Sequence, residues 1–484
     1  MATASVDREP MALDALLGDR YTESDFERSF YRQDLAAVPS FLARLLANTE
    51  PAAVARPRTA EEVAALVRHA AARCLPIIPR AAATSTYWNS VPVRGGIVVD
   101  LNGLRGCLSL DEERLTVTVL PGTRWGELET WLGRRGCALR SYPTSAPSAT
   151  VGGWISMEGY GIGSLKYGGL DRQVIRLEVV LPDGSLFEAA AETNPPLSWF
   201  LTAEGTLGII TRVELAVRRQ PAQTRHYLLA FPDMISLQSA ILDLTGTDPL
   251  PFFMHMSTVE HQRMLRRAGF EPPTDQPTLA VTFQGDADEV ARAEALLRRA
   301  ADRWGANELP ADRAVEEWDN RFMALRLKRG GPTLLGAESW LPLDKLNAYN
   351  ADVTQLAHRQ RVNIATYGNV VSPTAASVMS LFAADESRSI SYILALGLTN
   401  RLYDIALRHG GRPYGIGFWN TPYIRRAWSQ ALSAERRARK RQIDPLNITN
   451  PGKLYEPPAI LWPPLFNAAM RMLAWMHRVT GRVS

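Results

Sequence analysis

Hydrophobic positions in the first part of the chain recur at helical spacing in some segments and form short β-branched runs in others. Residues 60–74 carry apolar side chains on one helical face, which predicts a helix there. A second helix is predicted from Trp125 to Arg135, where Gly136 ends it. Strands are predicted at residues 76–79, 97–101, 115–120 and 178–181.

The pattern changes after Pro221, where glycines become fewer and strands alternate with long helices. The strands are predicted at residues 227–231, 251–255 and 278–283, and the helices at residues 287–304 and 343–360. This alternation is typical of a separate α+β domain. We therefore expect an α+β protein with an N-terminal helical extension, two domains and a tail. Their expected bounds are 1–48, 49–221, 222–455 and 456–484.

The composition is that of a soluble globular chain, with 46% hydrophobic and 21% charged residues. The net charge is only +4, and we expect no nucleic-acid partner. A basic run from Arg436 to Arg441 fits either an anionic partner or the solvated face of a helix. The three scattered cysteines supply neither an iron–sulfur cluster nor a CxxC zinc site, and they fit a reducing compartment.

The first 19 residues lack the basic and apolar regions of a signal peptide. No run of apolar residues reaches the ~18–20 that cross a membrane. The expected location is therefore the cytoplasm, with a peripheral contact at the inner membrane surface left open.

Three segments are rich in glycine, small residues and hydroxyls. They are residues 80–85, 143–153 and 204–211. Because such segments let backbone N–H groups approach a bulky anion without a Cβ in the way, they favour a site for a diphosphate and a flat ring system. Ordinary tight turns in a β-rich domain would explain the glycines equally well if each cluster stood alone.

Taken in order, these segments resemble the flavoproteins that bind FAD through a two-part α+β domain, typified by vanillyl-alcohol oxidase and p-cresol methylhydroxylase. The details point to the branch of glycolate oxidase flavin subunits and D-lactate dehydrogenases. Residues 80–85 match its RGxGTS loop with alanines in place of glycines, and residues 143–153 match its P-x-S…T-(I/V)-G-G loop. Lys166–Gly168, the EGTLGIIT segment at 204–211 and the NPGK segment at 450–453 follow in the same order.

The resemblance implies a two-part FAD-binding domain and a C-terminal α+β substrate domain with a ferredoxin-like sheet. The cofactor-binding residues that it implies are Arg80, Ala81, Ala82, Ala83, Thr84, Ser85, Pro143, Ser145, Thr150, Val151, Gly152, Gly153, Gly205, Gly208, Ile209, Ile210 and Asn450. Many relatives attach FAD covalently to a histidine or cysteine, but residues 80–86 and 151–161 contain neither. We therefore predict non-covalent FAD.

The segment Gly159–Ser164 also approaches the dinucleotide fingerprint GxGxxG, but no helix pattern follows it, so we expect no nicotinamide site there. Metal-dependent members of the family carry metal-ligand histidines in two motifs. The corresponding residues 364–371 and 410–420 contain none, so we predict no catalytic metal of that kind.

Residues in these two segments are candidates for the chemistry: Tyr367, Asn369, Tyr414, Trp419 and Asn420. Tyr414 would act as a proton acceptor if Arg412 lowered its pKa, whereas the aromatic residues would also serve as simple packing beside the ring. Arg321 and Arg326 are candidate carboxylate anchors, or surface arginines on a helix. His255 lies in an apolar strand, where a core histidine and a catalytic one remain alternatives.

The tail at residues 461–482 combines an apolar helical stripe with tryptophans and arginines. The stripe comprises Leu465, Phe466, Ala469, Met470, Leu473 and Met476, with Trp462, Trp475, Arg471, Arg478 and Arg482 beside it. This mixture fits a membrane-surface helix, a docking helix for a partner subunit, or a helix packed on its own domain.

The resulting hypothesis is an FAD-dependent oxidoreductase that takes a hydride from a small 2-hydroxy acid or related alcohol. Its electrons would pass to oxygen, a quinone or an iron–sulfur partner protein. One alternative is a non-catalytic flavin-binding subunit that relays electrons within a larger dehydrogenase, which the missing histidines would favour. Another is an NAD(P)H-driven reductase that shares the flavin fold.

Overall fold

The computed structural model describes residues 13–36, 38–455 and 459–480. The first of its three β-sheets has the strand order β1-β2-β4-β3, with β2, β4 and β3 parallel. These strands are Tyr21–Thr22, Ala53–Ala55, Ile97–Asp100 and Ile77–Arg80. Helix α4 (Ala60–Ala72) begins where the Thr59 hydroxyl accepts a hydrogen bond from the Glu62 N–H, and its predicted apolar face is buried.

The second sheet is antiparallel, with the order β5-β6-β10-β8-β9 and with β7 also paired to β10. Its strands are β5 (Cys107–Asp111), β6 (Thr116–Val119), β7 (Cys137–Leu139), β8 (Val174–Val180), β9 (Leu186–Ala189) and β10 (Ile209–Arg219). Helices α5 (Trp125–Gly133), α6 (Val151–Ile155), α7 (Ser164–Tyr167) and α8 (Ser198–Leu201) connect them. All three predicted elements in this region are present: the strand at 115–120 is β6, the helix at 125–135 is α5, and the strand at 178–181 overlaps the end of β8.

The third sheet is an eight-stranded antiparallel sheet with the order β14-β11-β13-β12-β16-β17-β15-β18. Its main strands are β11 (Gln223–Ala230), β12 (Phe253–Ser257), β13 (Thr278–Gly285), β15 (Thr333–Pro342), β16 (Ala365–Ser372) and β17 (Ala375–Ala384). The short edge strands are β14 (Asn307–Glu308) and β18 (Arg412–Pro413). This sheet is wider than a single four-stranded ferredoxin-like unit.

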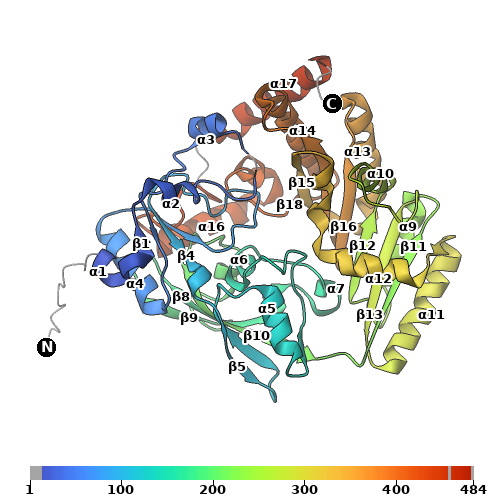
Figure 1. Ribbon diagram of the computed structural model, residues 1–484, viewed down its shortest axis with the longest axis horizontal. Helices are drawn as coiled ribbons and strands as arrows, with labels where there is room; N and C mark the ends of the chain where they lie inside the picture. Colours follow the sequence, from blue (N-terminus) through green and yellow to red (C-terminus); the bar gives the residue numbers. More distant parts are fainter. Residues whose placement is uncertain (1–12, 37, 456–458, 481–484) are drawn as a thin grey trace.

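The two faces of the third sheet have different neighbours. One face packs on α9 (Met234–Thr245), α11 (Ala287–Arg303), α13 (Leu346–Gln360) and α14 (Ser389–Arg408) and forms the largest apolar core. The other face carries α10 (Val259–Arg267) and α12 (Ala311–Asp319) and contributes polar side chains to a cavity. In Figure 1 this sheet stands beside the two smaller sheets. Because side chains alternate along a strand, each strand serves both faces.

The basic run of residues 436–441 lies on α16 (Gln430–Ile443), where Arg437 and Arg441 are exposed and Arg436, Arg439 and Lys440 are packed. The Lys440 ammonium is buried and donates to the Asp444 carboxylate at 2.6 Å and to the Thr206 carbonyl at 2.8 Å. Arg436 and Arg439 lie over the rings of Trp428 and Trp199. The packed half of the run therefore anchors α16 to Thr206 and to Trp199 on α8, while its exposed half fits the solvated face of a helix.

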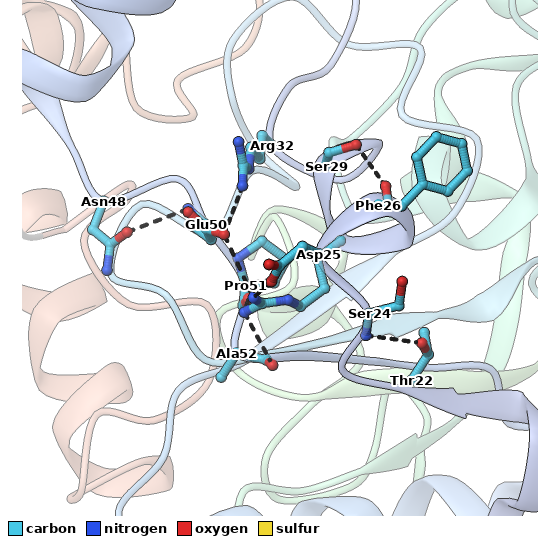
Figure 2. Close-up of polar contacts among 11 residues, drawn as sticks. Thr22, Ser24, Asp25, Phe26, Ser29, Arg32, Asn48, Glu50, Pro51 and Ala52 are labelled. Atoms are coloured by element: carbon cyan, nitrogen blue, oxygen red, sulfur yellow. Dashed lines mark hydrogen bonds and ion pairs between the residues drawn. The ribbon is translucent and has the colours of Figure 1, made fainter.

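The N-terminal segment forms three short helices, α1 (Leu13–Leu17), α2 (Asp25–Ser29) and α3 (Ser40–Leu46). Figure 2 shows how polar contacts hold this segment, including the ion pair between Arg32 and Glu50 at 2.6 Å. Arg28 donates to the Pro51 carbonyl at 2.7 Å, just before β2. Residues 1–12 of the expected extension lie outside the described residues.

The C-terminal helix α17 (Pro463–Thr480) packs along α14 at the top of Figure 1. The contact is closest at Gly397, where a Cβ atom would lie 2.4 Å from the Ala474 nitrogen and 2.7 Å from the Met470 carbonyl oxygen. Residues 456–458 and 481–484 of the tail, Arg482 among them, are outside the described residues. Among the helices that the structure describes, none is long and apolar enough to cross a membrane.

We predict that Gly397→Ala lowers the free energy of unfolding by about 1–3 kcal/mol, because the added methyl group meets backbone atoms of α17 that cannot yield. Gly133→Ala is the matched control, since its Cβ approaches only the flexible Gln220 side chain at 3.3 Å. Helix propensity alone would make this control stabilising by about 0.5–1 kcal/mol. Urea unfolding of both variants measures the difference, and equal effects would show that the helix contact is not tight.

Candidate functional site

A cavity of about 530 Å³ lies between the loops of the two smaller sheets and the polar face of the third sheet. Three turns line it: residues 80–90 after β3, residues 143–150 before α6, and residues 203–210 at the start of β10. Fifteen of the predicted cofactor-binding residues line this cavity together. They are Arg80, Ala81, Ala82, Ala83, Thr84, Ser85, Pro143, Ser145, Thr150, Gly152, Gly153, Gly205, Gly208, Ile209 and Ile210.

Two predicted residues, Val151 and Asn450, lie outside the cavity lining. The Val151 side chain is buried in the apolar core beneath the second loop, and its N–H donates to the Thr123 carbonyl. The Asn450 side chain donates to the carbonyls of Asn89 and Glu204, both at 2.8 Å. Asn450 therefore holds two of the lining turns together from behind.

Buried charges support the same turns. Glu204 accepts hydrogen bonds from the N–H groups of Ile416 and Gly417 and from the Asn89 amide, at 2.6–2.9 Å. Burial raises the pKa of this carboxyl and lowers the pKa of the nearby Lys453 ammonium, which donates to the Asn89 carbonyl. Because the two groups also favour each other's charged form, each is less costly to bury than it would be alone.

The cavity presents polar groups that need a partner. The hydroxyl oxygens of Thr150 and Ser90 are buried in its wall and have no hydrogen-bond partner within the described protein. Unpaired buried hydroxyls are unfavourable unless a ligand completes their hydrogen bonds. The residues present therefore fit a large polar cofactor such as FAD. Among the described residues that line the cavity, none is a histidine or cysteine that would attach it covalently.

In the first loop, residues 80–85, one of the three alanines has a strained backbone. Ala83 has φ = 50°, in the left-handed region, whereas Ala81 and Ala82 have negative φ. A Cβ in the left-handed region approaches the following carbonyl, so glycine is normally preferred there. Arg80, at the start of the loop, is tied down by the carbonyls of Gln33 and Tyr31 at 2.8 and 3.3 Å.

A smaller chamber of about 60 Å³ adjoins the large cavity on the polar face of the third sheet. Three histidines, His226, His255 and His261, line it together with Tyr367 and Trp318. The chamber and the large cavity share part of their walls. The shared residues are Thr144, Met323, Ala324, Arg326, Glu338, Asn369, Ser377 and Met379. This junction is where a substrate in the chamber would meet a cofactor in the large cavity.

The strand register explains how the junction is assembled. His255 on β12 lies opposite Asn369 on β16, and Asn369 lies opposite Ser377 on β17. In the next row, Tyr367 is opposite Met379, which is opposite Glu338 on β15. Because opposed residues share a face of the sheet, these side chains all project to the cavity side. His255 Nδ1 is 2.8 Å from Asn369 Oδ1, so this histidine faces the chamber rather than the apolar core.

Glu338 is the carboxylate at the junction, and the sequence interpretation did not include it. It accepts hydrogen bonds from the Tyr87 hydroxyl at 2.8 Å and from the Ser377 hydroxyl at 3.1 Å. Burial raises the pKa of Glu338, and the two hydrogen bonds oppose that rise only in part. The signal in the sequence is that Glu338 is the single charged residue in the run of residues 333–342, which forms β15.

The tyrosines predicted as catalytic candidates differ from the expectation in their ionisation. Tyr414 lines the large cavity and its hydroxyl accepts from the Trp154 indole at 3.3 Å. Burial raises the pKa of Tyr414, so the proposed lowering by Arg412 is wrong. The Arg412 guanidinium lies over the Trp340 ring instead. Burial also raises the pKa of Tyr367, whose hydroxyl contacts the Met379 sulfur at 3.1 Å.

The remaining candidates separate into two groups. Arg321 and Arg326 both line the chamber, and Arg326 also reaches the junction. Asn420 lines neither cavity, and it donates to the Tyr403 hydroxyl and the Gly415 carbonyl. Trp419 packs on Trp88 with a ring separation of 4.8 Å. Within the described residues, no group of three His, Cys, Asp or Glu side chains is placed to hold a metal ion.

Comparison with known proteins gives the same picture of the cofactor. A family model described as an FAD binding domain matches residues 51–190, and one described as the C-terminal domain of FAD linked oxidases matches residues 220–454. The glycolate oxidase subunit GlcD of Bacillus subtilis is 24% identical over 458 residues, covering 90% of this chain and 94% of that protein. A mitochondrial cytochrome-dependent D-lactate dehydrogenase of Arabidopsis thaliana is 24% identical over 435 residues, covering 84% and 74%.

Solved structures show the same fold. The p-cresol methylhydroxylase structure with bound substrate superposes with a TM-score of 0.77 at 17% identity, covering 92% of this chain and 95% of that one. An alkyldihydroxyacetonephosphate synthase structure superposes with a TM-score of 0.73 at 20% identity, covering 90% and 84%.

The fold, the loops and the matched domains define an FAD-linked oxidase or dehydrogenase, with FAD as its cofactor. Both the two-part cofactor domain and the C-terminal α+β domain predicted from the sequence are confirmed. The chain belongs to the vanillyl-alcohol oxidase/p-cresol methylhydroxylase family of FAD-binding oxidoreductases, and it is similar to the glycolate oxidase and D-lactate dehydrogenase members.

We predict that Ala83→Gly raises the free energy of unfolding of the FAD-loaded protein by about 0.5–1 kcal/mol. The substitution removes the Cβ atom that makes the left-handed backbone conformation of Ala83 unfavourable. Ala82→Gly is the matched control one residue away. Since Ala82 already has negative φ, the same substitution there lowers the free energy of unfolding by about 0.5–1 kcal/mol through added chain entropy. Chemical denaturation of both holoproteins measures the difference, and a loss of stability in both variants would contradict a strained Ala83.

Proposed function

We propose that this protein oxidises a small 2-hydroxy acid or a related alcohol at the junction of the two cavities. Its electrons then pass to a quinone, oxygen or a partner protein. The observation that carries the proposal is the placement of Glu338, a half-buried carboxylate with a raised pKa, at the wall shared by the FAD cavity and the chamber. The relatives named glycolate oxidase and D-lactate dehydrogenase support a 2-hydroxy acid as the substrate class.

Oxidation of an alcohol requires a hydride acceptor and a proton acceptor. FAD supplies the first, since it accepts the hydride from the carbinol carbon when bound. Glu338 supplies the second, because its ionised oxygen can take the hydroxyl proton as the C=O bond forms. Two electrons and one proton leave with the hydride and a second proton goes to the carboxylate, so the product is a 2-oxo acid. The hydroxyls of Tyr87 and Ser377 hold the carboxylate in place.

The chamber provides positive charge for a substrate carboxylate. Arg326 reaches the junction, and its only described acidic partner, Glu317, is 3.6 Å away. Arg321 has no carboxylate within ion-pair distance among the described residues, and its guanidinium lies over the rings of Trp318 and Phe322. A guanidinium held on aromatic faces keeps its charge and its forked donors, which suit a carboxylate. Asn369 lines both cavities as Arg326 does, and its side-chain NH2 can donate to the substrate hydroxyl.

Anaerobic mixing of the FAD-loaded protein with a panel of 2-hydroxy acids tests the function. We expect bleaching of the oxidised flavin band by at least one member of the panel. The matched alcohols that lack the carboxylate should react more slowly, because they do not engage Arg326 or Arg321. Bleaching by NADPH alone would support a reductase instead, and no bleaching by any donor would support an electron-relay subunit.

We predict that Glu338→Gln lowers kcat by about 10²–10⁴-fold, the usual contribution of a general base, while FAD remains bound. A base must be ionised, so kcat/KM of the unmodified protein falls as the pH drops through the pKa of Glu338, which lies above its ordinary value of 4.5. Ser377→Ala removes a hydrogen bond that stabilises the Glu338 carboxylate and so raises the pKa of Glu338 further. The acid limb of the pH–rate profile, where activity falls with decreasing pH, then moves to higher pH in this variant. A pH–rate profile measures both effects.

Ser339→Ala is the control for this series. Ser339 neighbours Glu338 on β15, but its buried side chain lies on the opposite face of the strand. The acid limb of the pH–rate profile of Ser339→Ala should coincide with that of the unmodified protein. Full activity in Glu338→Gln would remove Glu338 from the proposed mechanism.

A further inference from the structure

Helix α17 has two apolar faces, and only one of them is covered. The inner face packs on α14 and comprises Phe466, Met470, Leu473 and Ala474. The outer face is formed by residues at spacings of three and four that are exposed: Leu465, Ala468, Ala469, Met472, Trp475, Met476 and Val479. Leu465, Met472, Trp475 and Val479 are 56–63% exposed. An apolar stripe of this length is unusual on a protein surface that faces only water.

The structure divides the stripe that the sequence predicted. Leu465, Ala469 and Met476 are exposed on the outer face, whereas Phe466, Met470 and Leu473 are half-buried on the other side of the helix. Self-packing alone does not account for the tail. One face of the helix packs on α14, and the opposite apolar face is exposed.

Helix α3 carries a second pair of exposed apolar side chains near the start of α17. Phe41 and Leu45 of α3 are 51% and 70% exposed, and one helical turn separates them. On its other side α3 shares an apolar cluster with Leu461 and Phe466 at the start of α17. Both helices stand at the top of Figure 1. We call the outer face of α17 together with Phe41 and Leu45 the apical surface.

The charged residues on α3 and α17 themselves are all basic, although Arg471 also lies 4.0 Å from the Asp404 carboxylate of α14. Arg44 lies on α3, and Arg471 and Arg478 lie on one flank of the α17 stripe. Neither α3 nor α17 contains an acidic residue within its described range. Two exposed tryptophans, Trp462 and Trp475, mark the two halves of the stripe. A negatively charged partner that also accepts apolar side chains is complementary to this combination.

We propose that the apical surface docks the protein on an anionic phospholipid membrane. Leucine, methionine and tryptophan side chains enter the boundary between headgroups and acyl chains, and the arginines contact phosphate groups. The helix lies in the plane of the interface, since no described helix can span the bilayer. The basic charge of α3 and α17, together with the exposed Trp462 and Trp475, is complementary to the anionic headgroups and the interface region of a lipid membrane.

Cosedimentation of the FAD-loaded, full-length protein with vesicles tests this proposal without any assay of turnover. We expect the protein to sediment with vesicles of phosphatidylglycerol and phosphatidylcholine and to stay in solution with phosphatidylcholine alone. Binding should weaken in high salt, where the Debye length falls to about 3 Å. Arg471→Gln should weaken binding about fivefold, as expected for one basic residue at an anionic surface.

The double variant Leu465→Ser/Trp475→Ser should weaken vesicle binding by about tenfold or more, because both side chains leave the interface. Ile235→Ser/Leu186→Ser is the matched control, since these two residues are 59% and 46% exposed on other elements. The control should sediment like the unmodified protein, and an unchanged flavin spectrum confirms folding in each case.

Two results would overturn the proposal. In the first, the unmodified protein stays in solution with the anionic vesicles. In the second, it forms a dimer that Leu465→Ser/Trp475→Ser dissociates while vesicle binding is absent throughout, which would assign the apical surface to a second copy of this chain. Neither result depends on which substrate the enzyme oxidises, so failure of this proposal and failure of the proposed function are distinguishable.

Discussion

The FAD cavity depends on the buried carboxylate of Glu204. This one side chain receives the Asn89 amide from the first loop and the N–H groups of Ile416 and Gly417 from the segment that carries Tyr414. The backbone carbonyl of Glu204 accepts a hydrogen bond from the side-chain NH2 of Asn450. The Lys453 ammonium in turn donates to the side-chain oxygen of Asn450. Segments separated by more than 200 residues thus meet at one charged group. Removing it would leave several buried N–H donors without partners.

This arrangement explains how the NPGK segment at residues 450–453 supports the cofactor site although Asn450 lies outside the cavity lining. Asn450 and Lys453 lie behind the lining turns and hold them at a fixed separation. Their buried charges and amides are stable only because Glu204 and nearby Asp34 compensate them; burial raises the pKa of Asp34 to about 6. The Asp34 carboxylate accepts from the Trp88 N–H at 2.8 Å, so the N-terminal segment secures the first loop in the same way.

Local patterns predicted the parts of the fold that local physics decides. The helices at 60–74 and 287–304 were evident from their apolar faces, and they correspond to α4 and α11. The cofactor loops were evident because glycines and hydroxyls in a fixed order have few other uses. The chamber was not evident, since its residues lie on six strands (β11, β12, β13, β15, β16 and β17) and on helices that come together only in three dimensions. Glu338 and His255 each look like a single ionisable residue in an otherwise uncharged run.

The alternation of side chains along β15 shows how one strand serves both the core and the chemistry. Ala337 and Leu341 pack in the main apolar core, while Glu338 and Trp340 face the cofactor side. A shift of one residue in the pairing with β17 would exchange these faces, burying the carboxylate among helices and exposing alanine to the substrate. The ten paired positions between the two strands oppose such a shift, because each core side chain would lose its apolar contacts. The position of the proposed base is therefore fixed by the same packing that stabilises the domain.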